Sequence, residues 1–230
     1  MTDPVAPRFS PALFSFLRGL AADNDKAWFE EHRSDYDTHV KEPALDFIEA
    51  FRPRLLSISP HFEANARVNG GSLFRIHRDT RFSKDKTPYK TNTGMHFRHE
   101  RAKDVHSPGF YLHLEPRNCF MGVGIYKPET KVAYTIREMI AAEPDRWQAI
   151  TGGDFADTFA LMGDSLKRPP KGFDPDHPLI DDLKRKDFIA SATLTQSEVT
   201  ATDFADRFEA LCRAGGPFMA FLCEAVGVDY

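Results

Sequence analysis

Cysteine is scarce in this sequence, with Cys119, Cys212 and Cys223 widely separated in a chain of 230 residues. Three scattered cysteines exclude a disulfide framework and the paired pattern of a structural zinc site. Long apolar runs are also missing, since none approaches the roughly 20 residues that span a bilayer. The first residues carry no basic flank before an apolar stretch, so we expect no secretory signal and no membrane partner. We therefore expect a cytoplasmic protein with reduced thiols.

Charge of one sign is not in large excess either. The formal net charge is −4, with 41% hydrophobic and 28% charged residues, which is ordinary for a globular protein. Bulk electrostatics therefore do not recruit nucleic acid. A chain of this length buries a substantial core, which argues against a largely disordered protein.

The hydrophobic pattern predicts one α+β domain over residues 1–230. Apolar residues recur at helical spacing through the first third and again in much of the last third, where residues 154–162 favour a short helix. The middle third alternates apolar and polar residues, as half-buried strands do. We expect an antiparallel central sheet packed by helices from the N-terminal and C-terminal thirds. The expected strands are 73–78, 95–98, 110–115, 119–126 and, later in the chain, 188–194.

A basic segment, residues 75–90 (RIHRDTRFSKDKTPYK), is the most distinctive part of the sequence. It holds six basic and two acidic side chains, a net charge of +4 in a chain of −4, so the rest carries −8. A local positive field concentrates anions, and arginine suits planar recognition of carboxylate or phosphate. The candidate ligand-binding residues are Arg75, Arg78, Arg81, Lys84, Lys86, Tyr89 and Lys90. The competing interpretation is a solvated loop with surface salt bridges.

The basic segment, together with DNDKAWFEEHRSDY near the N-terminus, closely resembles the conserved hypothetical family called domain of unknown function 2461. FYLHLEP, GVGIYKPE and PPKGFDPDHPLIDDLKRKDF are also similar to that family. The resemblance runs from about Phe14 to the C-terminus. It implies a single α+β domain and a prominent basic loop, and it supplies no catalytic residues.

Strand alternation places polar side chains on one face of the expected sheet. If the strands are neighbours, this face carries Arg75, His77, His96, Arg98, Tyr111, His113 and Glu115. Gly122 and Gly124 lie on the same parity as Phe120 and leave a trough where a ligand can approach the backbone. The basic segment is expected to fold over this trough as a rim.

Three functions are compatible with this arrangement, so whether the protein is an enzyme stays open. We favour binding of a small phosphate- or carboxylate-bearing ligand by the basic segment. In the first alternative, His77 or His113 acts as general base at the same site and Glu115 orients the imidazole. In the second, the protein is an interaction module that docks an acidic partner or a nucleic-acid backbone.

No cofactor is indicated by the motifs. Gly122-Val123-Gly124 lacks the third glycine of a dinucleotide fingerprint, and no phosphate-binding P-loop pattern occurs. A metal site built from His77, His96 and His113 is not expected, because they lack a metal-binding spacing and the nearby arginines repel a cation.

Overall fold

The computed structural model describes residues 8–81, 83–101 and 106–230. A helical N-terminal arm comes first, and its α1 opens with Pro11 at the first helical position, where the missing N–H costs nothing. Asp25 begins the next helix, because its side chain accepts a hydrogen bond of 2.9 Å from the Trp28 N–H. The arm consists of α1 (Pro11–Ala22), α2 (Lys26–Glu31), α3 (Arg33–Tyr36), the π-helical η1 (Asp37–Lys41) and α4 (Glu42–Ile58).

A five-stranded antiparallel sheet forms the centre of the fold, in the order β1-β2-β3-β5-β4. The α+β class and the antiparallel sheet predicted from the sequence are confirmed. The strands are β1 (Thr93–Arg98), β2 (Gly109–Leu114), β3 (Cys119–Ile125), β4 (Ala160–Met162) and β5 (Phe188–Leu194). Residues 160–162, expected to be helical, are instead a strand, because pairing with β5 overrides their local preference.

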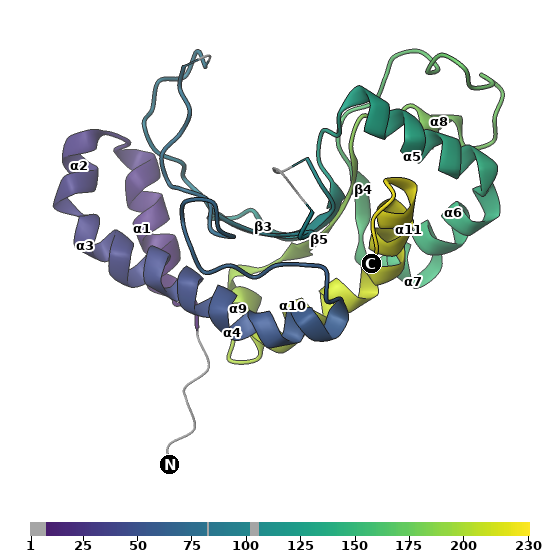
Figure 1. The fold of residues 1–230 in the computed structure, drawn as a ribbon. Helices are drawn as coiled ribbons and strands as arrows, with labels where there is room; N and C mark the ends of the chain where they lie inside the picture. Colours follow the sequence, from purple (N-terminus) through teal and green to yellow (C-terminus); the bar gives the residue numbers. More distant parts are fainter. Residues whose placement is uncertain (1–7, 82, 102–105) are drawn as a thin grey trace.

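Helices from both ends of the chain pack on the sheet, as predicted. Figure 1 shows α4 and α10 beneath it, with α5, α6 and α11 at the end where β4 lies. The C-terminal helices are α5 (Thr130–Ala142), α6 (Pro144–Thr151), α7 (Gly153–Thr158), α8 (Ile180–Leu183), α9 (Gln196–Val199), α10 (Phe204–Ala214) and α11 (Gly216–Ala225). In the described part of the chain, no helix is both long and apolar enough to cross a bilayer.

The core lies between the lower face of the sheet and these helices. Alternate strand residues such as Met95, Leu112 and Met121 are completely buried there. The ring of Phe97 on β1 packs 5.4 Å from Phe51 of α4, measured between ring centroids. Since the apolar set of each strand faces the helices, its polar and glycine positions are left on the opposite face.

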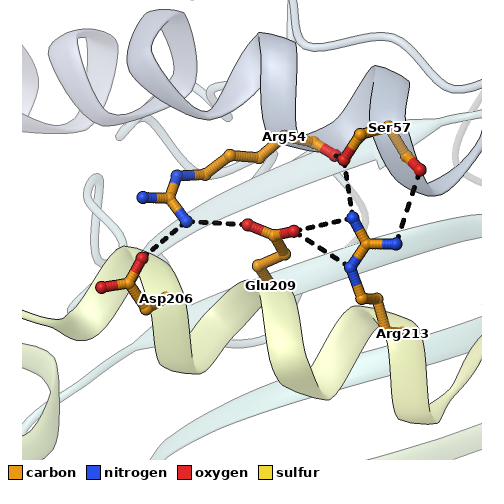
Figure 2. Close-up of polar contacts among 5 residues, drawn as sticks. All are labelled: Arg54, Ser57, Asp206, Glu209 and Arg213. Atoms are coloured by element: carbon orange, nitrogen blue, oxygen red, sulfur yellow. Dashed lines mark hydrogen bonds and ion pairs between the residues drawn. The ribbon is translucent and has the colours of Figure 1, made fainter.

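An ion-pair network, the α4–α10 clamp, joins these two helices at the back of the core (Figure 2). Glu209 lies at its centre and accepts hydrogen bonds from Arg54 at 2.7 Å and from Arg213 at 2.8 Å. Arg54 also pairs with Asp206, and Arg213 donates to the Ser57 hydroxyl at 2.7 Å. The hydrogen bond from Arg213 lowers the pKa of Glu209. Burial opposes this effect, and the hydrogen bond from Arg54 adds to it, so that the net pKa is lowered.

We expect Glu209→Gln to lower the free energy of unfolding by about 1 kcal/mol at pH 7, the upper end for partly exposed pairs. The folded-state pKa is depressed, so this stability is present above the ordinary glutamate pKa and is lost as pH falls through the folded value. Urea unfolding at pH 7 and pH 3 measures both effects. Glu49→Gln, which breaks a single exposed pair with Arg52, is the matched control. An equal loss in both variants at pH 7 would contradict the role of the clamp.

The predicted strand over residues 73–78 is wrong. Its hydrogen bonds are divided between two partners, since Phe74 N–H donates to the Gly94 carbonyl while Arg78 N–H donates to the Pro88 carbonyl. Only isolated bridges form, at Leu73 with Met95 and at His77 with Tyr89. The segment therefore follows the edge of β1 briefly and then turns away, so that residues 76–78 pair with residues 88–90 of the same loop.

Candidate functional site

A cavity of about 480 Å³ lies on the face of the sheet opposite the core. Its floor is formed by the glycines of β2 and β3, and its walls by aromatic and histidine side chains. The lining includes Phe74, His96, Gly109, Tyr111, His113, Phe120, Gly122, Gly124, Tyr126, Met162, Ile189 and Ser191. The trough predicted over Gly122 and Gly124 is therefore present. Its volume falls within the roughly 300–1,000 Å³ of small-molecule sites.

Glycines make this hollow possible in two different ways. At Gly122, a Cβ atom would meet nothing closer than 3.6 Å, so the missing side chain is open space within the cavity. At Gly109, a Cβ atom would collide with the His96 imidazole, so this glycine makes room for that ring. Gly122 thus adds volume to the cavity, and Gly109 allows the His96 ring to lie in the cavity wall.

His96 is a buried wall residue that bears an unsatisfied polar atom. Its Nδ1 has no hydrogen-bond partner within the described residues. Burial, with a smaller effect of the positive charge of Arg98, lowers the pKa of His96 to about 4. The imidazole is therefore neutral at pH 7, and its edge is packed against Phe74 and Tyr111. Such an orphaned group is costly in an apolar wall, which makes it a candidate ligand contact.

A hydrogen-bonded chain, the Tyr111–His113–Glu115 chain, runs along β2 beside the cavity. The Tyr111 hydroxyl lies 2.9 Å from His113 Nδ1, and His113 Nε2 lies 3.4 Å from Glu115 Oε2. Consecutive members are two residues apart in an extended segment, so their side chains project to the same face. His113 also stacks on Phe120 with a centroid distance of 4.6 Å.

The residues just before β1 support this chain. The Asn92 amide lies 3.2 Å from His113 Nδ1, and the Thr91 hydroxyl donates to Glu115 at 3.2 Å. Burial acts to raise the pKa of Glu115, but hydrogen bonds from Asn118 and His113 outweigh it and the net pKa is lowered. Burial lowers the pKa of His113, more than Glu115 raises it. At pH 7 the chain therefore holds a carboxylate beside a neutral imidazole.

The basic segment rises beside α1 at one side of the sheet, in blue in Figure 1. Arg78 pairs with Asp85 and Thr87, and Arg81 pairs with Asp79 at 2.7 Å. The hydrogen bond from Arg81 lowers the pKa of Asp79 to about 2. These arginines therefore face carboxylates within their own segment.

The other candidates in the segment have separate surroundings. The Lys86 ammonium donates to the Thr80 carbonyl at 2.8 Å, and Lys84 is exposed. Tyr89 is buried against Phe29, with ring centroids 4.2 Å apart. None of the seven candidate ligand-binding residues is among those that line the cavity.

Lys90 and Arg75 form no ion pair with a carboxylate among the described residues, and Lys90, unlike the exposed Lys84 and Lys86, is half-buried. The Lys90 ammonium lies over the ring of Phe74, 5.3 Å from its centroid, and Phe74 is a cavity wall. Burial, and then the nearby positive charge of Arg75, lower the pKa of Lys90. A half-buried ammonium therefore lies on this wall residue, and the exposed guanidinium of Arg75, which also acts on the Asp79 carboxylate, is near enough to repel it.

The predicted polar face is partly correct. His96, Tyr111 and His113 do share one face, and it is the face of the cavity. The expectation that Arg75 and His77 share it is wrong, because the segment turns away from β1 and Phe74 takes the wall position. His77 is exposed and lies near Phe29 and Tyr89 instead.

Several cavity residues were not identified from the sequence. Strand alternation places Tyr111 on the correct face but indicates no role for it. The side formed by Met162, Ile189 and Ser191 was missed, although the alternating burial of β5 follows from its sequence pattern. The short β4 carried no strand signal of its own.

The family model described as "Conserved hypothetical protein (DUF2461)" matches residues 12–221. The search of curated proteins finds no match.

Proposed function

Since this chain belongs to the conserved hypothetical family DUF2461, whose description names no activity, we propose a function from its geometry: it binds a small amphipathic anion. The apolar part of the ligand occupies the cavity over Gly122, and its carboxylate or phosphate group lies toward Lys90 and Arg75. The observation that carries this proposal is the half-buried Lys90 ammonium on the Phe74 ring, which has the positive charge of Arg75 nearby and no ion pair with a carboxylate among the described residues.

Two electrostatic arguments support an anion rather than a neutral ligand. A half-buried ammonium beside a guanidinium is destabilised by both desolvation and repulsion. An anion between them relieves both penalties and forms charge-assisted hydrogen bonds. Arg78 and Arg81 are already paired with Asp85 and Asp79, so we assign them the role of stabilising the conformation of the basic segment.

The fluorescent sulfonate 8-anilinonaphthalene-1-sulfonate is a suitable probe, because it joins an apolar aromatic body to one anionic group. We expect saturable binding to the native protein, and we expect Lys90→Gln to raise the dissociation constant about tenfold, or about 1.4 kcal/mol. Arg75→Gln should act in the same direction. Fluorescence titration at fixed ionic strength measures both.

Arg81→Gln is the matched control, since it removes an arginine that is paired with Asp79. It should leave the dissociation constant within a factor of two. Because the dye also binds molten states, near-ultraviolet circular dichroism must show native packing in every variant. If Lys90→Gln and Arg81→Gln behave alike, the cations behind Phe74 do not hold the anion. Binding that instead weakens steeply with salt for all variants, and extends to single-stranded nucleic acid, would favour the interaction-module alternative.

Acid–base catalysis in the same cavity is a second candidate function. The observation that favours it is the hydrogen bond between His113 and Glu115, which orients a neutral imidazole at the cavity wall. His77, the other candidate base, lies outside the lining. The expected signature is a proton-transfer activity that is lost in His113→Gln.

A further inference from the structure

The position of His113 within its hydrogen-bonded chain limits how it can act as a base. Glu115 is ionised and can only accept, so His113 Nε2 must carry the proton that points to it. His113 Nδ1 is then the acceptor, and it already faces the Tyr111 hydroxyl at 2.9 Å and the Asn92 amide at 3.2 Å. Both ring nitrogens are therefore occupied within the protein.

The Tyr111 hydroxyl is the end of this chain that retains free lone pairs. It donates its only proton to His113, so its oxygen can still accept one from a ligand. Tyr111 lines the cavity, and its ring packs against the ring of Phe74. The Lys90 ammonium lies over that same Phe74 ring. Gly94 leaves room for the hydroxyl, because a Cβ atom at this position would collide with it.

We propose that Tyr111 is the proton-transferring residue of the cavity and that His113 acts through it. A proton leaves the ligand for the Tyr111 oxygen while the original hydroxyl proton passes to His113 Nδ1. The resulting imidazolium is stabilised by Glu115, with the connectivity of a serine–histidine–aspartate triad but a phenol in place of the alcohol. The ligand class is a carbon or oxygen acid with an apolar body. This inference rests on the proposed binding of a ligand in the cavity.

Burial raises the pKa of Tyr111, so the phenol is protonated in the resting protein. A free phenolate is therefore not required, since proton arrival and departure at the oxygen are coupled. The ionisable groups that face His113 are Tyr111 and Glu115, both carried by or directly following β2. The rate should increase as pH rises through the pKa of His113, which lies below the ordinary value of 6.5.

The Kemp elimination of 5-nitrobenzisoxazole tests this without knowledge of the natural ligand. A base takes the proton from carbon 3, those electrons complete a nitrile, and the N–O bond breaks to release a coloured cyanonitrophenolate. We expect saturable turnover above the buffer rate. Tyr111→Phe and His113→Gln should each lower kcat/KM at least 100-fold, while Tyr134→Phe, a matched change at an exposed tyrosine outside the cavity lining, should leave it within twofold. Glu115→Gln should shift the pH inflection downward.

The outcomes separate the two proposals. If Tyr111→Phe keeps the wild-type rate while His113→Gln loses it, His113 is the direct base and the assignment of Tyr111 is overturned. If 5-nitrobenzisoxazole displaces the anilinonaphthalene dye but is not turned over, proton transfer fails and binding stands. If it does not bind while the anilinonaphthalene dye still does, the inferred proton transfer is overturned and the proposed binding of an anion stands; if neither binds the native protein, both proposals fail. Nitrogen-15 NMR supplies a ligand-free check, since a His113 tautomer with its proton on Nδ1 also overturns the inference.

Discussion

Gly124→Ala is expected to destabilise the protein by about 3 kcal/mol or more, in the range reserved for backbone strain and buried clashes. Gly124 adopts φ +125°, a conformation that side chains with a Cβ rarely adopt. A Cβ atom there would also lie well inside 3.0 Å of the Phe188 carbonyl oxygen, which belongs to the backbone of β5. Neither strand can move without breaking the β3–β5 pairing. Urea unfolding monitored by circular dichroism measures the loss.

Gly122→Ala is the matched control for this prediction. It makes the same change two residues earlier on the same strand, where a Cβ atom meets nothing within 3.6 Å. We expect no loss of stability and a gain of up to about 1 kcal/mol, because alanine restricts the unfolded chain more than glycine does. Equal destabilisation by the two variants would show that the backbone at Gly124 is not the cause.

Gly122→Leu is expected to abolish binding of the anilinonaphthalene dye, with a dissociation constant raised at least 100-fold. The position is open to the cavity, so the new side chain fills the volume that the ligand body needs. The fold should be retained, since the Cβ contacts to Tyr111 and Phe120 are of ordinary length. Fluorescence titration, with the melting temperature measured in parallel, tests both statements.

Thr193→Leu is the matched control here. Thr193 is an exposed residue of β5 that lies opposite Phe120 and outside the cavity lining, so the substitution adds the same apolar bulk at the margin of the cavity and not on its floor. Its dissociation constant should equal that of the wild type. Unchanged dye binding in Gly122→Leu would mean that the dye occupies another surface, and the proposed function would then fail with it.

Strand parity was the part of the site that the sequence could predict. Alternation has a fixed period of two, so it predicts that Tyr111 and His113 share one face of their strand and that Gly122 and Gly124 share one face of theirs. That the two sets lie on the same side of the sheet follows from the pairing of Tyr111 with Gly122. The same rule failed at Arg75 and His77, because it assumes one continuous ladder and this segment changes its hydrogen-bond partner after Phe74. Alternation in a sequence carries no information about that change.

Charge pairing within the basic segment depends on the path of the loop, which composition does not show. Asp85 lies seven residues after Arg78 and reaches it only because residues 88–90 return to pair with 76–78. The same return brings Lys90 to Phe74 and close to Arg75. The net charge of the segment therefore predicts a local field, but it does not distinguish the cations that are paired with carboxylates from those that are not.

The position of β5 between β3 and β4 has a consequence for the nascent chain. β4 joins the sheet only through β5, so Met162 reaches the cavity only after residues 188–194 have emerged from the ribosome. The helices that bury the opposite face, α10 and α11, are made later still. Until then the apolar side of β1, β2 and β3 is incompletely covered, which is the kind of surface on which chaperones act. The cavity is accordingly complete only in the nearly finished polypeptide, so under the proposed function a shortened translation product does not bind the ligand.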